Sequence, residues 1–174
     1  CWYDDKKNLR KISKQDDMKG SYLGPEYSQD QIEKDLKDLG AVFKTLSEEH
    51  LIEKVSSDLA NNDAIGWFQG RMEFGPRALG SRSIIGNPQS SEMQKNLNLK
   101  VKYRESFRPF APSVLKEDLS EWFDMDCESP YMLLVAKINQ NKQIEMTRDE
   151  KNLFGIDKLN IRRSSVPAVT HVDY

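Results

Sequence analysis

Arginines, lysines and glycines are concentrated in one stretch of this chain, residues 70 to 112. The stretch reads GRMEFGPRALGSRSIIGNP and, after a helix-like segment, KVKYRESFRPFAP. It holds eight cations against three glutamates, which leaves a local charge of +5 in a chain of 174 residues whose formal net charge is −2. A basic island in an otherwise acidic protein indicates a concentrated anion site rather than a generally adhesive surface. The cations are Arg71, Arg77, Arg82, Lys95, Lys100, Lys102, Arg104 and Arg108.

The residue types in this stretch favour phosphate as the anion. A guanidinium group matches two phosphate oxygens at once and stays charged when it is partly buried. The glycines let the backbone approach a ligand closely, and a short helix predicted over residues 76–79 would direct its positive N-terminus to the same place. We expect Arg77 and Arg82 to line one wall of this site, with Lys102 and Arg108 opposite them.

The same residues have two other possible uses. The cations could belong to a solvated face, which is the interpretation we favour for Lys95 and Lys100. Aromatic rings beside arginines can also stack on bases, as in an RNA-binding module, although core packing is the alternative use of these rings. A sequence pI of about 5.8 makes nucleic acid the weaker alternative, because nucleic-acid-binding domains are usually basic. The aromatic residues are Trp67, Phe68, Phe74, Phe107 and Phe110.

The composition is typical of one globular domain of ordinary size, with 37% hydrophobic and 31% charged residues. No apolar run approaches the roughly 18 to 20 residues that a membrane span needs, and no signal peptide is visible, so we expect a cytoplasmic protein without a membrane partner. Two cysteines and two histidines provide no zinc-ligand spacing, and we therefore expect no metal site in this chain.

The chain divides into a short leading segment and one domain. Residues 1–20 are charged without apolar periodicity and are interpreted as a linker or the tail of an upstream domain, and residues 21–174 as the domain itself. Strands and helices mix irregularly, which favours an α+β (mixed α/β) fold. Four helices are predicted: one from Ser28 to Gly40, one from Ser47 to Asn61, one that starts after Ser90 or Ser91, and one over residues 119–123. Strands are predicted over residues 64–69, 83–85, 113–115 and, as a buried strand, 131–138. An extended piece is predicted over residues 166–169.

Four segments of the chain resemble the C-terminal domain of the NodU/CmcH family of O-carbamoyltransferases. They are GRMEFGPRALGSRSI, KVKYRESFRPFAPSVL, SPYML and VPAVTHVD, and the similarity runs from YLGPEYS at Tyr22 to Asp173. The opening CWYDD is similar to the exit from the family's preceding domain. The resemblance implies a YrdC-like fold, a twisted mixed sheet with flanking helices around a positive pocket. The family continues past VTHVD, so the resemblance also implies that this domain is truncated at its C-terminus.

The resemblance implies a biosynthetic carbamoyltransferase. In the family, this domain binds carbamoyl phosphate and ATP, the latter with Mg²⁺, and makes carbamoyl-adenylate. An upstream actin-like domain of the same chain carries the family's metal site and transfers the carbamoyl group to the hydroxyl of a small-molecule acceptor. Because that domain is missing here, we expect the isolated fragment to be inactive.

Matching the motifs residue by residue gives the expected ligands. Arg77, Arg82, Lys102 and Arg108 are implied as ligands of carbamoyl phosphate and of the nucleotide phosphates, and Arg71 and Arg104 belong to the same motifs with less defined roles. No residue is predicted to act as a catalytic acid or base. We expect Glu73 to pair with an arginine, since a carboxylate among cations has a lowered pKa, and His171 to have a structural role.

Overall fold

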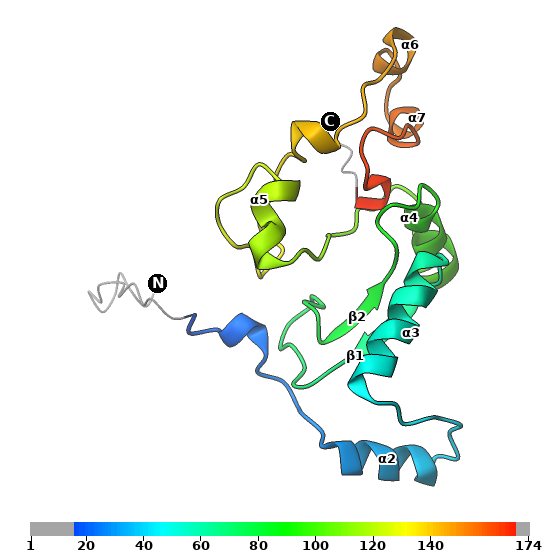
Figure 1. Ribbon diagram of the computed structural model, residues 1–174, viewed down its shortest axis with the longest axis vertical. Coiled ribbons are helices and arrows are strands. Elements are labelled where there is room, and N and C mark those ends of the chain that lie inside the picture. Colours follow the sequence, from blue (N-terminus) through cyan, green and yellow to red (C-terminus); the bar gives the residue numbers. More distant parts are fainter. Residues whose placement is uncertain (1–15, 170–174) are drawn as a thin grey trace, which may run out of the picture.

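A two-stranded antiparallel hairpin lies beside the long helix of the chain in the computed structural model, which describes residues 16–169 (Figure 1). Strands β1 (Ile65–Phe68) and β2 (Arg82–Ile85) pair with Ile65 opposite Ile85 and Phe68 opposite Arg82. The N–H of Gln69 donates to the carbonyl of Ser81 at 2.9 Å and extends the pairing by one step. The first arginine motif, residues 70–80, is therefore the loop of a hairpin.

Helices and short helical turns make up the remaining regular structure of residues 16–169. Together with the hairpin they agree with the predicted α+β class. The α-helices are α2 (Gln29–Asp38), α3 (Glu48–Ala60), α4 (Met93–Asn96), α5 (Leu119–Trp122), α6 (Arg148–Lys151) and α7 (Ile156–Leu159). The other turns are η1 (Lys19–Ser21), the π-helical η2 (Leu97–Val101), η3 (Lys116–Asp118), η4 (Gln140–Lys142) and η5 (Pro167–Val169).

The two N-terminal helices begin and end where their capping residues predict. The hydroxyl of Ser28 accepts the N–H of Gln31 at 3.3 Å, and the hydroxyl of Ser47 accepts the N–H of His50 at 3.4 Å. Gly40 adopts a φ of +68° just after α2, a conformation that glycine reaches without a Cβ penalty. Ser28 and Ser47 each satisfy a backbone donor that the first turn of a helix leaves free, so local sequence fixes these starts.

The core of the described chain is small. Met93 and Leu97, from the helix formed by α4 and η2, pack with Ala168 of η5, and Phe110 lies against this cluster. The N–H of Ala168 donates to the carbonyl of Pro88 at 3.1 Å, which holds the C-terminal turn in place. This cluster anchors the helix that leads into the second arginine motif.

Several predicted elements are absent from the structure. Residues 76–79 and 113–115 form neither a helix nor a strand, and residues 166–169 contain a 3₁₀ turn rather than an extended piece. The predicted buried strand 131–138 is wrong, because only Ile138 makes a bridge, to Phe123, and Leu133 is 79% exposed. Helix α4 has no serine cap, since its N-cap residue is Glu92. An apolar run becomes a buried strand only when a neighbouring strand pairs with it.

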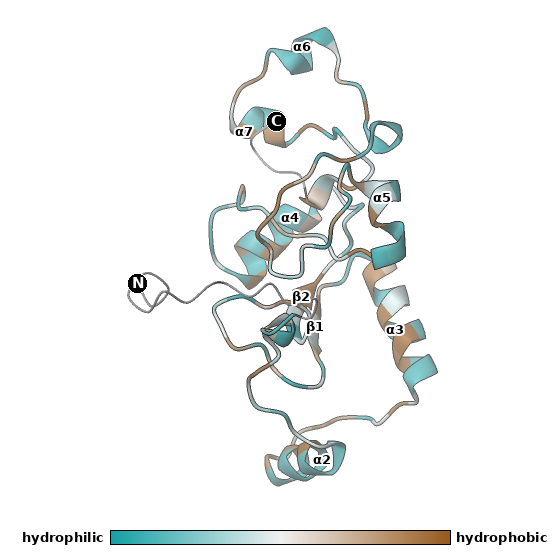
Figure 2. Ribbon diagram, turned by 90° about the vertical axis from the view of Figure 1, so that its left-hand side faces the viewer, coloured by the Kyte–Doolittle hydropathy of each residue, from teal (hydrophilic) through white to brown (hydrophobic). Residues whose placement is uncertain are grey.

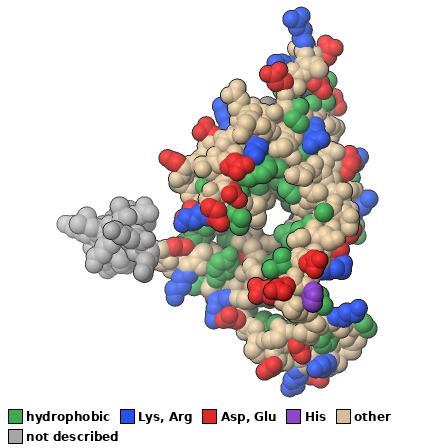
Figure 3. Space-filling view, viewed as in Figure 1, with side chains coloured by type: hydrophobic (Ala, Val, Ile, Leu, Met, Phe, Trp, Pro, Cys, Tyr) green, Lys and Arg blue, Asp and Glu red, His purple; other side chains and the backbone are tan. Residues whose placement is uncertain are grey.

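Much apolar surface remains exposed. Among residues 16–169, the side chains of Val42 and Phe154 are more than 90% exposed. Hydrophobic residues lie along α3 (Figure 2), yet Val55 and Leu59 of this helix are only half-buried, and Leu51 and Ile52 are exposed. Figure 3 shows an opening between the two halves of this face of the molecule.

Within residues 16–169, none of the helices combines the length and the apolar character needed to cross a bilayer. The interpretation of residues 1–20 as a linker falls mostly outside the described residues, as does His171.

The segment before α2 pairs with the hairpin loop. The N–H of Gly24 donates to the carbonyl of Met72 at 2.9 Å, and the N–H of Met72 donates to the carbonyl of Pro25 at 3.0 Å. The N–H of Phe74 also donates to the carbonyl of Ser21 at 2.7 Å. Residues 21–25 thus support one side of the first arginine motif.

Replacing Gly24 with alanine is expected to destabilise this pairing. A Cβ at this position would lie 2.9 Å from the carbonyl oxygen of Met72, closer than real Cβ atoms approach backbone, and overpacking of this kind costs about 1–3 kcal/mol. Urea titration followed by circular dichroism measures the free energy of unfolding. Gly66→Ala in β1 is the matched control, because nothing lies within 4 Å of a Cβ built there. Equal stability of the two variants would contradict the prediction.

Candidate anion-binding site

The hairpin loop folds around one buried carboxylate, that of Glu73. Its Oε1 accepts the backbone N–H groups of Leu79 and Ser81, both at 2.7 Å, and its Oε2 accepts the Nε–H of Arg82 at 3.2 Å. The side chain of Glu73 has no exposed surface. The predicted pairing of Glu73 with an arginine is confirmed. The sequence predicts a helix over residues 76–79 that directs its N-terminus at a ligand. In the structure there is no such helix, and the N–H groups of Leu79 and Ser81 point at the internal carboxylate of Glu73 instead.

The surroundings of Glu73 hold it in the charged form. Burial acts to raise the pKa of this carboxyl, but hydrogen bonds from backbone N–H groups, with that of Ser81 the strongest, and the charge of Arg82 outweigh burial and lower the pKa below its ordinary value of 4.5. A carboxylate that accepts two or three such bonds is stabilised as the anion. Glu73 is therefore a structural anion at neutral pH, not a proton carrier.

Two of the predicted ligands, Arg71 and Arg82, bind groups of the protein itself. Arg82 donates to Glu73 and, through Nη2, to the carbonyl of Gly75 at 2.6 Å. Arg71 donates to the carbonyl of Gly24 at 2.8 Å and to the carboxylate of Glu26 at 2.9 Å. Both guanidinium groups thus tie the hairpin loop to its neighbours. Their roles as ligands of an anion stay a prediction.

The second arginine motif follows the π-helical turn η2 and is fixed at Arg104. The Nε–H of Arg104 donates to the side-chain oxygen of Asn98 at 2.6 Å, and its guanidinium lies 5.0 Å from the ring centroid of Phe110. Arg108 is exposed, and its Nε lies 3.8 Å from a carboxylate oxygen of Glu105. One carboxylate at this distance only partly balances two neighbouring guanidinium groups.

Cations of both motifs act on Arg104. Burial is the main cause that lowers the pKa of the Arg104 guanidinium; the positive charge of Arg108 lowers it further, Glu105 opposes the shift, and Arg77 adds to it. Arg77 comes from the hairpin loop, about thirty residues before Arg108 in sequence. Charges from both motifs, those of Arg77 and Arg108, therefore act on Arg104.

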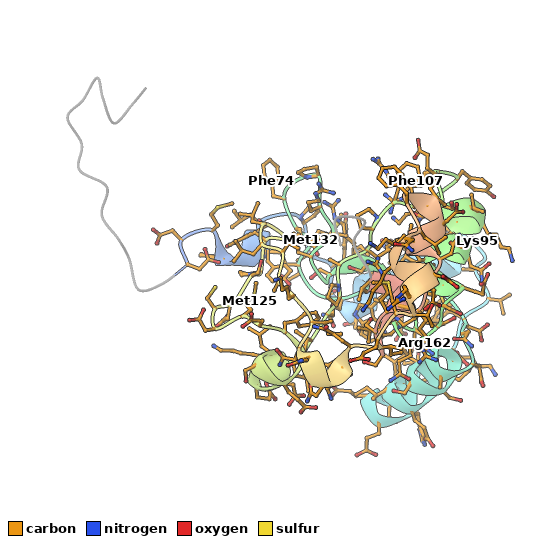
Figure 4. The ribbon with its side chains drawn as sticks, turned by 90° about the horizontal axis from the view of Figure 1, so that it is seen from above. Phe74, Lys95, Phe107, Met125, Met132 and Arg162 are labelled. Atoms are coloured by element: carbon orange, nitrogen blue, oxygen red, sulfur yellow. The ribbon has the colours of Figure 1, made fainter. Side chains whose placement is uncertain are left out.

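Three cations of the two motifs, Arg77, Lys100 and Lys102, have no partner in the described part of the chain. All three are exposed, and none of their side chains makes a hydrogen bond or an ion pair with residues 16–169. Lys95, which we expected on a solvated face, projects away from the hairpin loop that carries Phe74 (Figure 4). Among the described residues, the positive charges of the two motifs that no carboxylate or carbonyl contacts are thus those of Arg77, Lys100 and Lys102.

Aromatic residues beside the cations are mostly at the surface. Phe74 is 75% exposed and Tyr103 is 86% exposed, whereas Phe110 is half-buried under Arg104. Core packing, the alternative use of these rings, therefore holds for Phe110 but not for Phe74. Exposed rings next to guanidinium groups are suited to stacking on a planar ligand.

The residue that sequence reasoning missed is Asn98. It is the fully buried polar side chain beneath the second motif. A signal was present, because Gln94 and Asn98 are four residues apart, next to the apolar positions Met93 and Leu97 on the same helix. Polar residues this close to a buried face point to internal hydrogen bonding.

A hollow on the surface lies apart from the arginine motifs, and residues 16–169 contain no cluster of metal-binding side chains. A hollow of about 300 Å³ runs along α2 and is lined by charged residues of that one helix, with no part of either arginine motif. Residues 16–169 contain no group of three or more histidine, cysteine, aspartate and glutamate side chains gathered as a metal site would require.

Comparison with known proteins agrees with the arginine motifs. The family described as Carbamoyltransferase C-terminus matches residues 56–174. The chain is 53% identical, over 99% of its length, to the uncharacterized protein sll1178 of Synechocystis sp.. It is 36% identical over 87% of its length to the nodulation protein NolNO of Sinorhizobium fredii, and 39% identical over 68% to the 3'-hydroxymethylcephem-O-carbamoyltransferase of Streptomyces clavuligerus.

These relatives are much longer than the region they share with this chain. The matched regions span 28%, 20% and 18% of the three proteins, in the order given.

We expect Glu73→Gln to destabilise the protein at neutral pH and to reduce the acid sensitivity of its stability. Because the pKa of Glu73 is lowered on folding, its carboxylate stabilises the fold above its ordinary pKa of 4.5, and this contribution is lost as the pH falls through the lowered value. The loss at pH 7 should be about 1–3 kcal/mol, the usual cost of breaking a buried charged hydrogen bond.

Urea titrations between pH 7 and pH 3 measure this effect. The difference in unfolding free energy between the unaltered chain and Glu73→Gln should shrink as the pH falls. Glu53→Gln, at an exposed position of α3 without a hydrogen-bond partner in the described chain, is the control and should show no such trend. A constant difference across this range would show that Glu73 is not the stabilising anion.

Proposed function

The chain belongs to the carbamoyltransferase family through the family's C-terminal domain, and we propose that it binds carbamoyl phosphate together with ATP and Mg²⁺. With one water consumed, the products would be carbamoyl-adenylate, phosphate and pyrophosphate; AMP leaves when the carbamoyl group passes to the hydroxyl of a small acceptor. The observation that carries this proposal is the pair Arg104 and Arg108 of the second motif: Asn98 and the ring of Phe110 hold the first guanidinium, and one carboxylate, that of Glu105, lies 3.8 Å from the second. Arg77 of the first motif is exposed and has no partner among the described residues.

The charge of the two substrates explains why such a cluster is needed. Carbamoyl phosphate is a small dianion, and the nucleotide is a polyanion, so the two repel each other when they approach. Fixed guanidinium groups offset this repulsion and stabilise charge on the departing phosphate groups without having to reorganise during the reaction. Phosphoryl-type chemistry depends mainly on such positioning and on the metal bound to the nucleotide, so no acid or base side chain is required here.

The acceptor is proposed to be a small molecule with a hydroxyl group. The name of the Streptomyces relative, a 3'-hydroxymethylcephem-O-carbamoyltransferase, supports this class of acceptor. We place the transfer step in an upstream actin-like, metal-binding region of a longer polypeptide, consistent with the small share of each relative that the chain spans. On this proposal the 174-residue chain binds the anions but does not transfer the carbamoyl group by itself.

The proposed domain is YrdC-like and comprises residues 21–174, with residues 1–20 as its linker. The family match over residues 56–174 supports one domain in this region.

Arg77→Ala is expected to weaken binding of carbamoyl phosphate about tenfold or more, since a hydrogen bond to a charged group contributes about 1.5–3 kcal/mol. Arg108→Ala should have a similar effect. Arg82→Ala should instead lower the stability of the chain, because it leaves Glu73 with one fewer donor. Isothermal titration with freshly prepared carbamoyl phosphate measures the affinity, and thermal unfolding measures the stability.

Lys95→Ala is the matched control for removal of one positive charge, because Lys95 is exposed and projects away from the hairpin loop (Figure 4). Equal affinities of Arg77→Ala, Lys95→Ala and the unaltered chain would reject the assignment of Arg77. If the chain instead bound tRNA with a steep dependence on salt and did not bind carbamoyl phosphate, the RNA-binding alternative would replace this proposal.

A further inference from the structure

Two buried amide side chains lie beneath the second arginine motif. Asn98 has no exposed surface and Gln94 is 7% exposed. They are four residues apart on the helix formed by α4 and η2, so they lie on the same helical face, one turn apart. Buried polar groups are costly unless they are hydrogen-bonded, which makes their partners informative about why they are present.

The hydrogen bonds of both amides lead to the arginine motif. The Nδ2 group of Asn98 donates to the carbonyl of Ser106 at 3.0 Å and to the carbonyl of Arg108 at 2.9 Å, and its Oδ1 accepts the Nε–H of Arg104 at 2.6 Å. The Nε2 group of Gln94 donates to the same carbonyl of Arg108 at 3.2 Å. Both side-chain hydrogens of Asn98 are thus used on residues 104–108.

The backbone between the helix and the motif is held in an uncommon conformation. Residues 97–101 form a π-helical turn, and Tyr103 has a φ of +48°, which is unfavourable for a side chain of this size. The N–H of Arg104 donates to the backbone carbonyl of Asn98 at 3.0 Å across this turn. Strained backbone persists only where surrounding contacts determine it, and Asn98 supplies these contacts with both its backbone and its side chain.

From this arrangement we infer that Asn98 is a positioning residue, whose side chain fixes the Arg104 guanidinium and the backbone from which the Arg108 side chain extends, so that both can receive the anion. Gln94 assists at the carbonyl of Arg108. The inference rests on the proposed anion site and goes beyond it, because Asn98 is buried and touches the ligand only through the arginines. Without these bonds, repulsion between Arg104 and Arg108 would favour conformations in which the two side chains separate.

The test is Asn98→Leu, which keeps the branched shape and the number of side-chain heavy atoms, although its methyl groups are larger, and removes the three side-chain hydrogen bonds. Inorganic pyrophosphate is the probe, because it presents the phosphate charge without the lability of carbamoyl phosphate. We expect binding about tenfold weaker than that of the unaltered chain, in line with the contribution of a buried hydrogen bond to a charged group. Asn96→Leu, on the same helix and without a side-chain partner in the described chain, should bind within about twofold of the unaltered chain.

Two further measurements separate positioning from general stability. Affinities are compared at a temperature at which circular dichroism shows both variants folded, where a loss of stability alone would leave the affinity unchanged. The NMR signal of the Arg104 Nε–H group should shift in Asn98→Leu and stay in place in Asn96→Leu, because it reports the hydrogen bond to Asn98.

The outcomes distinguish this inference from the proposed function. Failure of the unaltered chain to bind pyrophosphate and carbamoyl phosphate would reject the anion site and, with it, the positioning role. Equal pyrophosphate affinities of the unaltered chain and folded Asn98→Leu would reject the positioning role alone. If Asn98→Leu does not fold, Gln94→Leu decides, since it removes one donor to the carbonyl of Arg108; binding about threefold weaker is expected, and unchanged binding would overturn the inference.

Discussion

Repulsion between guanidinium groups is the constraint on which the arginine site depends. Arg104 is half-buried and lies in the positive fields of Arg108 and Arg77, so its charge is disfavoured by both burial and its neighbours. The fold offsets this cost locally: Asn98 accepts the Nε–H of Arg104, the ring of Phe110 lies under its plane, and Glu105 faces Arg108. These contacts leave the cluster net positive, and a bound anion would supply the missing charge.

Cations that look equivalent in sequence have different surroundings in the fold. Arg82 bonds to Glu73 and a loop carbonyl, and Arg71 bonds to the segment before α2, so these two stabilise the loop that carries Arg77. The loop itself closes on the buried carboxylate of Glu73, an anion built into the protein. Internal pairing of Arg71 and Arg82 therefore has a consequence for function: it fixes the backbone from which Arg77, unpaired among residues 16–169, projects.

Sequence reasoning succeeded where a feature depends on a few neighbouring residues. The caps at Ser28 and Ser47, the turn at Gly40 and the two strands of the hairpin are local and were predicted. The prediction of a strand over residues 131–138 was wrong, because a strand needs a neighbouring strand to pair with. The prediction of a helix over residues 76–79 was also wrong, because the loop folds around Glu73, which accepts the N–H groups of Leu79 and Ser81. The motifs were located from sequence, but the division between paired and unpaired arginines was not, because the partners of Arg71 are 45 and 47 residues away in the chain.

Polar contacts, more than apolar packing, hold the two arginine motifs in place. Four buried hydrophobic residues, Met93, Leu97, Val166 and Ala168, make up the core of the described chain, so packing alone gives the arginine loops little support. Their conformations rest instead on short polar contacts, with Glu73 in the first motif and Asn98 in the second. Such contacts fix direction as well as distance, whereas apolar packing mainly fixes volume. A site that must aim several like charges at one anion therefore requires buried polar groups, even where the surrounding core is small.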